Sequence, residues 1–367
     1  MNLNFKQLMT EAARLTRAGN LRAATAAIQS ALRAGSRERT VAANDSAPEL
    51  SASTASPASN AIDVEARELP QPARNETFAS QRPVPTPGRF VEGNYADAAT
   101  ARDYKLYIPP GAGSAPLPLV VMLHGCTQSP DDFAAGTAMN ELAQAQGFYV
   151  LYPAQSKQAN PQACWNWFKH THQQRGRGEP ALLAGMTREV MAQHAIDPWR
   201  VYVAGLSAGG AMAAILASAY PDLYAAVGVH SGLAAGAAAD LPSALAAMKG
   251  GRAGSAESVH GVPTIVFHGD ADATVHPANG EHVVKASAGA DCAVETQRVP
   301  SAHTRASTKR IYTDADSGRV VAEYWLVHGT AHAWSGGRSQ GSYTDSRGPD
   351  ASAEMLRFFL EHPRPMT

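Results

Sequence analysis

The chain has 367 residues, of which 17% are charged, and a formal net charge of −1. This length provides for one large or two ordinary domains with a substantial core, and the near-neutral balance gives no global electrostatic reason to expect a nucleic-acid ligand. Three cysteines in a chain of this length exclude a fold built on a disulfide scaffold. No apolar run reaches the roughly 18–20 residues of a membrane span, and the first residues lack the layout of a signal peptide, so a cytoplasmic protein is expected.

Residues 1–35 are predicted to form a helical hairpin. Apolar residues recur at helical spacing on both sides of a turn at Gly19-Asn20, and Gly35 suits the end of the second helix. Basic residues outnumber acidic ones within residues 1–40. One interpretation is a helix pair packed on the rest of the protein or on itself, with solvated charges. The other is a basic amphipathic anchor for a hydrophobic particle, a membrane surface or a partner protein.

Residues 36–88 are predicted to be a disordered linker. Ala, Ser, Asn and Thr dominate this stretch, apolar periodicity is lost, and prolines accumulate between Pro48 and Pro87. Such a segment buries too little apolar surface to offset the entropy lost on ordering. The main folded domain is therefore expected at residues 89–367.

Within that domain, short apolar runs alternate with helical stretches. Strands are predicted at 104–109, 117–123, 148–152, 201–204, 225–229, 264–267 and, as the last strand, 321–327. Helices are predicted at 189–194, 210–220 and 351–361. This alternation predicts an α/β domain with a doubly wound, mostly parallel sheet. Functional residues should then lie just past the carboxyl ends of the strands.

The strand at 201–204 runs directly into Gly205-Leu-Ser-Ala-Gly209, a G-x-S-x-G pentapeptide, which is followed by a helical run of small residues. Strand, tight turn and helix are the context that makes this pattern a nucleophile elbow with an exposed serine. The pentapeptide alone arises by chance often enough to be weak evidence. Its flanking elements make Ser207 the candidate nucleophile.

An activated serine needs a base, a carboxylate that orients the base, and donors for the oxyanion. In the α/β-hydrolase order, the acid and then the histidine follow the serine. Asp272 lies in the loop after the strand at 264–267, and we expect it to orient the base. The neighbouring Asp270 is expected to stabilise the turn instead.

The general base is predicted to be His332, which lies among small residues in the loop beyond the strand at 321–327. His328 is close to the end of that strand, so a packed or backbone-bonded role is expected for it. His303 and His276 are weaker alternatives for the base.

The oxyanion donors are expected to be the backbone N–H groups of Ala208, which follows the nucleophile, and Cys126, which follows the strand at 117–123. Cys126 and Cys164 are able to pair under oxidising conditions, which leaves Cys292 over, but the sequence does not decide this. The histidines and cysteines lack metal-site spacing, and the glycines lack a dinucleotide-binding pattern. We therefore expect no metal and no cofactor.

Several segments, in this order along residues 88–362, resemble esterases of the poly(3-hydroxybutyrate) depolymerase type. They include Met122-Leu-His-Gly-Cys-Thr-Gln128, Cys164-Trp-Asn-Trp-Phe168, Gly205-Leu-Ser-Ala-Gly-Gly210, Phe267-His-Gly-Asp-Ala-Asp272 and His332-Ala-Trp-Ser-Gly-Gly337, of which the first two are far more specific than the serine pentapeptide. The resemblance implies an α/β-hydrolase fold and a catalytic triad. Carried over by motif, the triad is Ser207, Asp272 and His332, with Cys126 in the oxyanion hole.

The resemblance also implies a carboxylic ester hydrolase acting on short-chain polyester. The same family contains feruloyl and acetyl-xylan esterases, so a smaller or plant-wall ester is the first alternative. A non-catalytic protein that coats polymer granules through residues 1–35 is the second. The chain looks most like intracellular, granule-associated members, because secreted depolymerases usually carry a signal peptide and a C-terminal substrate-binding module.

Three tryptophans near these motifs are candidates for substrate contact. Trp165 and Trp167 belong to the Cys164–Phe168 motif, and Trp334 lies two residues past the predicted base. Either of the first two rings would cover a chain of methyl-bearing ester units, and Trp334 would form a wall of the acyl pocket. The alternative is that these aromatic side chains belong to the core.

The anchor interpretation of the N-terminal region predicts a separable loss of function. Deleting residues 1–40 should weaken binding to polyhydroxybutyrate granules and spare the hydrolysis of soluble esters, because the basic amphipathic segment lies outside the catalytic motifs. Co-sedimentation with granules and turnover of p-nitrophenyl butyrate measure the two effects. Unchanged partitioning of the shortened protein onto granules would rule out the anchor.

Overall fold

The computed structural model describes residues 87–97, 100–250, 261–289, 291–300 and 304–365. The hairpin predicted for residues 1–35 and nearly all of the linker predicted for residues 36–88 lie outside the described residues.

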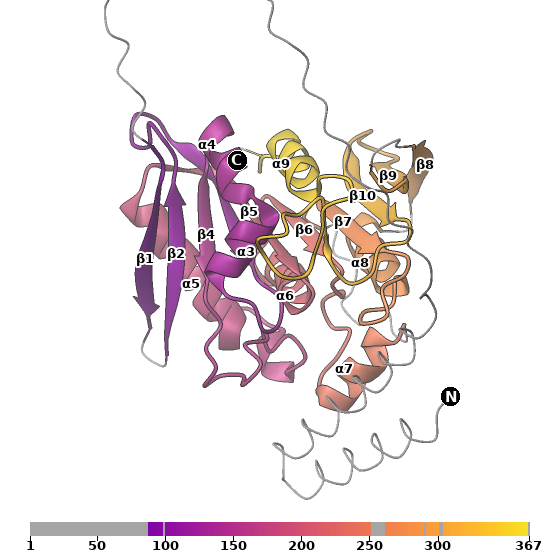
Figure 1. Cartoon of the computed structure of the whole chain (residues 1–367), viewed down its shortest axis with the longest axis horizontal. Helices are drawn as coiled ribbons and strands as arrows, with labels where there is room; N and C mark the ends of the chain where they lie inside the picture. Colours follow the sequence, from indigo (N-terminus) through magenta and orange to yellow (C-terminus); the bar gives the residue numbers. More distant parts are fainter. Residues whose placement is uncertain (1–86, 98–99, 251–260, 290, 301–303, 366–367) are drawn as a thin grey trace, which may run out of the picture. The chain divides into compact units, whose positions relative to one another are not determined.

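A ten-stranded sheet runs through the described part of the chain, in the order β1-β2-β4-β3-β5-β6-β7-β10-β9-β8 (Figure 1). Its strands are β1 (Arg89–Ala96), β2 (Ala101–Ile108), β3 (Leu117–Leu123), β4 (Tyr149–Pro153), β5 (Ile196–Leu206), β6 (Ala226–His230), β7 (Thr264–Gly269), β8 (Cys292–Val299), β9 (Ser307–Asp314) and β10 (Val320–Val327). Neighbouring strands from β4 to β10 are parallel. On either side of them, β1 and β2 and then β9 and β8 pair antiparallel.

Helices cover both faces of this sheet, as a doubly wound fold requires. The described α-helices are α3 (Pro130–Thr137), α4 (Met139–Gln146), α5 (Gly178–Gln193), α6 (Ala208–Ala219), α7 (Leu241–Met248), α8 (Ala278–Ala288) and α9 (Ala351–Glu361). Side chains of α5, α6 and α8 pack on one face together with Leu119 and Val121 of β3. Side chains of α3, α4 and α9 pack on the other face together with Val120 and Met122. Successive residues of β3 thus point into opposite cores, which explains why the strand is apolar throughout.

The central strands and α9 lie where the sequence predicts them, whereas the outer strands β1, β8 and β9 were not predicted. β8 is exposed along nearly its whole length and pairs only with β9. A strand of this kind carries polar residues on both faces and lacks the apolar pattern from which strands are read. The expectation of a mostly parallel sheet is therefore correct for the centre of the sheet, and the flanks are antiparallel.

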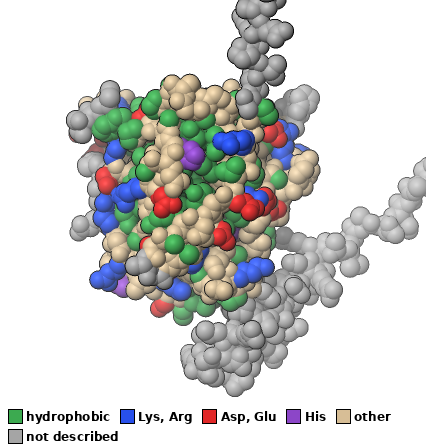
Figure 2. Space-filling model, turned by 90° about the vertical axis from the view of Figure 1, so that its left-hand side faces the viewer, with side chains coloured by type: hydrophobic (Ala, Val, Ile, Leu, Met, Phe, Trp, Pro, Cys, Tyr) green, Lys and Arg blue, Asp and Glu red, His purple; other side chains and the backbone are tan. Residues whose placement is uncertain are grey.

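The face of the molecule at the β1 edge carries basic, acidic and apolar side chains interspersed with one another (Figure 2). Lys105 of β2, for example, lies 3.4 Å from Glu92 and 2.6 Å from Asp131. Among the described helices, none combines the length and the apolar character that crossing a bilayer requires.

Helix α9 provides a direct test of the core. Phe359 is fully buried and stacks on Tyr202 of β5, with ring centroids 5.0 Å apart, while the adjacent Leu360 is 40% exposed. Phe359→Ala should lower the free energy of unfolding by about 3–5 kcal/mol, because it removes a buried ring and leaves a cavity. Leu360→Ala is the matched control and should cost less than about 1 kcal/mol. Equal losses for the two variants in urea denaturation would contradict this packing.

Candidate active site

Ser207 occupies the tight turn between β5 and α6. Its φ of 58° and ψ of −117° lie outside the regions that ordinary residues prefer, so the turn is strained. A Cβ on Gly209 would lie 2.0 Å from the carbonyl oxygen of Leu123, at the end of β3. The first turn of α6 therefore approaches β3 more closely than any residue with a side chain allows, and Ser207 is held at the edge of the sheet.

The carboxyl ends of the neighbouring parallel strands lie at this same edge and are joined by backbone hydrogen bonds. These bonds, 2.9 to 3.1 Å long, run from Ser207 N–H to His230 O, from Ser231 N–H to Phe267 O, and from Asp270 N–H to Val327 O. The loops that follow β7 and β10 carry Asp272 and His332. The structure thus brings the elbow and both of these loops to one edge.

The predicted acid and base are hydrogen-bonded to each other: His332 Nδ1 lies 2.7 Å from Asp272 Oδ2. The other carboxylate oxygen, Oδ1, accepts the backbone N–H groups of Thr274 at 2.9 Å and Val275 at 2.8 Å. Burial raises the pKa of the Asp272 carboxyl, but hydrogen bonds from His268, His332 and the Val275 backbone outweigh it. The pKa consequently lies well below its ordinary value, and Asp272 is ionised at neutral pH.

The second ring nitrogen of His332, Nε2, makes no hydrogen bond to another described residue, and neither does the Ser207 hydroxyl. The Ser207–His332 hydrogen bond of an assembled triad is therefore not formed in this structure. Catalytic hydrogen bonds are often long in unliganded enzymes and tighten in the substrate complex. Neither group is therefore engaged by another described residue.

The nearby histidine His328 is arranged differently. Its Nδ1 lies 2.8 Å from Asp270 Oδ2 and its Nε2 lies 2.9 Å from Thr308 Oγ1. Asp270 also accepts the Gly329 backbone N–H at 2.7 Å, so it stabilises the turn after β10 as expected. With both ring nitrogens engaged, His328 has none free to accept a proton from serine. Of the weaker alternatives, His276 Nδ1 accepts the Ala278 backbone N–H, and His303 lies outside the described residues.

The two expected oxyanion donors, the backbone N–H groups of Cys126 and Ala208, donate to no other described residue. The loop that carries Cys126 is held in place by the Cys164-Trp165 segment. A disulfide joins Cys126 to Cys164, with Cα atoms 4.2 Å apart, so the pairing that the sequence left open is present. The indole N–H of Trp165 donates to the carbonyl of His124 at 3.1 Å. Cys292 is the remaining free cysteine.

The three tryptophans considered for substrate contact are buried in this structure. Trp165 is 0%, Trp167 5% and Trp334 1% exposed. The Trp334 indole N–H donates to Ser352 Oγ of α9, and Trp167 packs edge-on against Phe168. All three rings belong to the core, which was the alternative. A sequence does not tell which way a loop side chain turns.

Two buried histidines support the site, and sequence reasoning gave them no role. His230 is 1% exposed; its carbonyl accepts Ser207 N–H, its Nε2 accepts Ser335 N–H at 2.9 Å, and its ring stacks on Trp334. Burial, and then the nearby His268 and His332, lower the pKa of His230 well below its usual range, so it stays neutral. His268 is fully buried, and its Nε2 lies 2.8 Å from the Val275 carbonyl and 3.5 Å from Asp272 Oδ2. The sequence signal that identifies both residues is a histidine at the end of an apolar strand.

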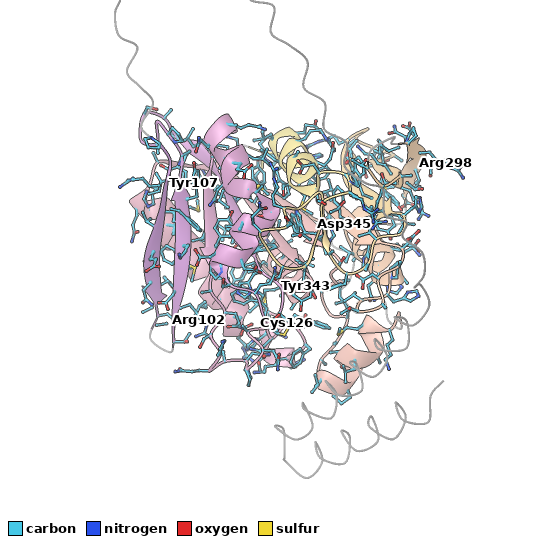
Figure 3. All side chains as sticks on the ribbon, in the orientation of Figure 1. Arg102, Tyr107, Cys126, Arg298, Tyr343 and Asp345 are labelled. Atoms are coloured by element: carbon cyan, nitrogen blue, oxygen red, sulfur yellow. A yellow bond between two sulfur atoms is a disulfide. The ribbon has the colours of Figure 1, made fainter. Side chains whose placement is uncertain are left out.

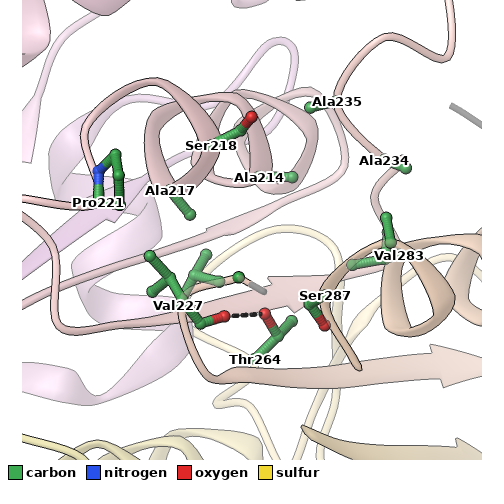
Figure 4. Close-up of a pocket in the computed structure, with 13 residues that line it drawn as sticks. Ala214, Ala217, Ser218, Pro221, Val227, Ala234, Ala235, Thr264, Val283 and Ser287 are labelled. Carbon is green, nitrogen blue, oxygen red and sulfur yellow. Dashed lines mark hydrogen bonds between the residues drawn. The ribbon is translucent and has the colours of Figure 1, made fainter. Parts of the chain in front are cut away.

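A separate cavity lies between α6, α8 and the first residues of β6 and β7 (Figure 4). Small residues line it, including Ala214, Ala217 and Ala286, and the hydroxyl of Thr264 is bonded to the Val262 carbonyl at 2.8 Å. Neither Ser207 nor the Asp272–His332 pair contributes to it. The chemistry of the site does not involve this cavity.

Residues 102–297 match the family model described as Esterase PHB depolymerase. The chain belongs to this family. Similar members of known type include poly(3-hydroxyalkanoate) depolymerase C of Paucimonas lemoignei, 35% identical over 192 residues that cover 49% of this chain and 46% of that protein. Acetylxylan esterase A of Emericella nidulans is 29% identical over 230 residues, which cover 56% of this chain and 73% of that protein. Feruloyl esterase B of Thermothelomyces thermophilus is 33% identical over 141 residues, 38% of this chain and 47% of that protein. The chain thus spans about half the length of the depolymerase and of the feruloyl esterase.

Among solved structures, an acetyl xylan esterase from Aspergillus awamori is similar, with a TM-score of 0.58 and 20% sequence identity. The match covers 74% of this chain and 99% of the other. This likeness, together with the sheet order and the helices on both faces, gives the chain the α/β-hydrolase fold that the sequence predicts.

The lowered pKa of Asp272 predicts a pH-dependent contribution to stability. Ionised Asp272 stabilises the fold above the ordinary carboxyl pKa of about 4, and this stabilisation is lost as the pH falls through the lower folded value. Asp272→Asn should therefore cost on the order of 1–3 kcal/mol of unfolding free energy at pH 7, and the deficit should shrink below about pH 4.

Asp270→Asn is the matched control, because the Asp270 and His328 side chains are 38% and 41% exposed. It should cost less than about 1 kcal/mol at either pH. Denaturant titrations at pH 7 and pH 3 measure both variants. An Asp272→Asn deficit that is equally large at the two pH values would contradict the assignment.

Proposed function

We propose that the protein is a serine carboxylic ester hydrolase that cleaves short-chain polyester, poly(3-hydroxybutyrate) or its oligomers. The observation that supports this most strongly is the 2.7 Å hydrogen bond between His332 and a buried, ionised Asp272. It lies at the sheet edge where Ser207 sits on its strained turn. Family membership supports the same reaction class.

In the proposed reaction, His332 Nε2 takes the proton of Ser207 as Oγ attacks the ester carbonyl. Asp272 accepts a hydrogen bond from the Nδ1–H group, which fixes the tautomer and stabilises the imidazolium that forms. The N–H groups of Cys126 and Ala208 bind the negative oxygen of the tetrahedral intermediate.

Collapse of that intermediate breaks the ester C–O bond, and His332 returns the proton to the leaving alcohol. Water then enters and His332 removes one of its protons, so that hydroxide attacks the acyl-serine. The second collapse breaks the bond between the acyl carbon and Ser207 Oγ, His332 returns the proton to Oγ, and the 3-hydroxy acid is released. The reaction as proposed needs no metal and no cofactor.

The polymer is proposed from the depolymerase relative, and one observation favours a second candidate, an acetylated or feruloylated plant-wall ester. The acetylxylan esterase relative is matched over 73% of its length, more than the depolymerase is. A coating protein without catalytic activity is disfavoured by the Asp272–His332 pair, since coating a granule requires no such pair.

We also propose that residues 1–35 anchor the protein to polyester granules. The excess of basic over acidic residues and the amphipathic spacing support this role. The catalytic domain is then residues 89–367, joined to the anchor by the linker at residues 36–88.

Single substitutions distinguish the proposed catalytic role of His332 from the structural role of the nearby His328. Ser207→Ala and His332→Ala should each lower kcat for p-nitrophenyl butyrate by at least about 10³-fold. His328→Ala is the control and should stay within about threefold, because both ring nitrogens of His328 are engaged elsewhere. Circular dichroism and thermal melts confirm folding. Retained turnover by Ser207→Ala would refute the nucleophile, and a loss with His328→Ala equal to that with His332→Ala would refute the base.

A substrate panel on the unmodified protein tests the choice of ester. Amorphous polyhydroxybutyrate granules, acetylated xylan and methyl ferulate are compared by kcat/KM, with the products identified by mass spectrometry. We expect release of 3-hydroxybutyrate or its oligomers at the highest rate. A clear preference for acetylated xylan or methyl ferulate would favour the second candidate instead.

A further inference from the structure

Tyr343 is a large exposed aromatic side chain beside the site described above. It is 47% exposed and lies immediately before the short strand β12 (Thr344–Asp345), which pairs with β11 (Trp334–Ser335). Its φ of 52° places a bulky residue in the left-handed region, which normally favours glycine. Strain of this kind persists only where the surrounding structure enforces it, and it is concentrated at functional sites.

The backbone on both sides of Tyr343 is fixed. The N–H of Ser342 donates to Asp132 Oδ1 of α3 at 2.9 Å, and the Ser342 hydroxyl donates to the other oxygen of the same carboxylate. The Tyr343 carbonyl accepts the N–H of Trp334 at 2.7 Å. An exposed ring is thus presented from a rigid segment and in a strained conformation.

The Tyr343 side chain lies beside two loops: the loop of His332, the proposed base, and the loop of Cys126, a proposed oxyanion donor. Its ring meets the His332 imidazole edge-on, with centroids 6.5 Å apart and planes at 77°. Its hydroxyl lies 3.3 Å from Thr127 Oγ1, and Thr127 follows the oxyanion residue Cys126. Thr127 itself has a φ of 67°, so strained residues lie at both ends of this contact. Figure 3 shows Tyr343 and Cys126 near each other at one end of the sheet.

We propose that Tyr343 is a specificity residue whose ring packs against the aliphatic chain of the ester bound between His332 and the Cys126 amide. The inference rests on the proposed function and names a substrate contact of that same site. The hydroxyl contact with Thr127 holds the ring in place, and the ring supplies an apolar surface for the acyl chain. Each methylene that is removed from water in this way raises affinity by about fourfold.

A chain-length series tests the contact. Tyr343→Ala and Tyr343→Gly should lower kcat/KM for p-nitrophenyl butyrate by about tenfold, mainly through KM, and change it less than about threefold for p-nitrophenyl acetate. Glycine adopts a φ of 52° without strain, so agreement between the two variants excludes a backbone effect. Tyr343→Phe keeps the ring but loses the hydroxyl contact with Thr127, so its loss on p-nitrophenyl butyrate should be smaller than that of Tyr343→Ala.

Phe90→Ala is the control, because Phe90 is a 37% exposed ring on β1 at the edge of the sheet. It should leave both esters unaffected. Equal losses for acetate and butyrate in the Tyr343 variants, or no loss at all, would overturn the proposal.

A binding experiment separates this proposal from the proposed reaction. A methyl-capped trimer of 3-hydroxybutyrate is titrated calorimetrically into Ser207→Ala and into the double variant Ser207→Ala, Tyr343→Gly. We expect the dissociation constant to rise about tenfold in the double variant. If the trimer binds with this difference while the unmodified protein hydrolyses no ester, the reaction fails and the contact stands. Equal affinities, or no binding to Ser207→Ala, would overturn the contact whatever the fate of hydrolysis.

Discussion

The level alignment of parallel strand ends at one edge of the sheet is the constraint on which the rest of the structure depends. Residues at or within two positions of the ends of neighbouring strands are register partners: Leu123 with Gly205, Leu206 with His230, His230 with Phe267, and Gly269 with Val327. A slip of one residue in any of these pairs would turn every side chain of that strand to the opposite face. The two apolar cores therefore fix the register, and the register fixes which loops meet at the edge.

The electrostatics of this edge come from one buried carboxylate among several histidines. His230 is kept neutral by burial and by its histidine neighbours, and it accepts the Ser335 N–H, which a protonated Nε2 is unable to do. Asp272 consequently holds the negative charge that His332 faces. In the proposed mechanism this charge stabilises the imidazolium form of His332. His230 also joins the elbow to the segment that follows His332. Its carbonyl accepts the Ser207 N–H, and its ring Nε2 accepts the Ser335 N–H.

The sequence predicts those parts of the fold whose physical cause is local. The central strands are buried on both faces and read as continuous apolar runs, and the bounds of α9 follow its amphipathic pattern. The positions of Asp272 and His332 follow from the rule that functional residues come after parallel strands. β8 is not predicted from the sequence because it is exposed and lacks an apolar pattern. The orientation of Trp165 and the pairing of Cys126 depend on distances between segments that are remote in the sequence, and the sequence does not contain those distances.

The strained residues of the chain indicate how the site is built. Among the described non-glycine residues with positive φ, Thr127, Ser207, Ser231 and Tyr343 lie on loops at or beside this edge. Each is held by bonds that a flexible loop would lack; Thr127 N–H donates to Gln162 O, and Ser207 N–H donates to His230 O. The stability of the two cores offsets the cost of these conformations. Donors and apolar surfaces fixed in this way need little rearrangement as charge develops on an ester oxygen, which is the property that electrostatic stabilisation of an oxyanion requires.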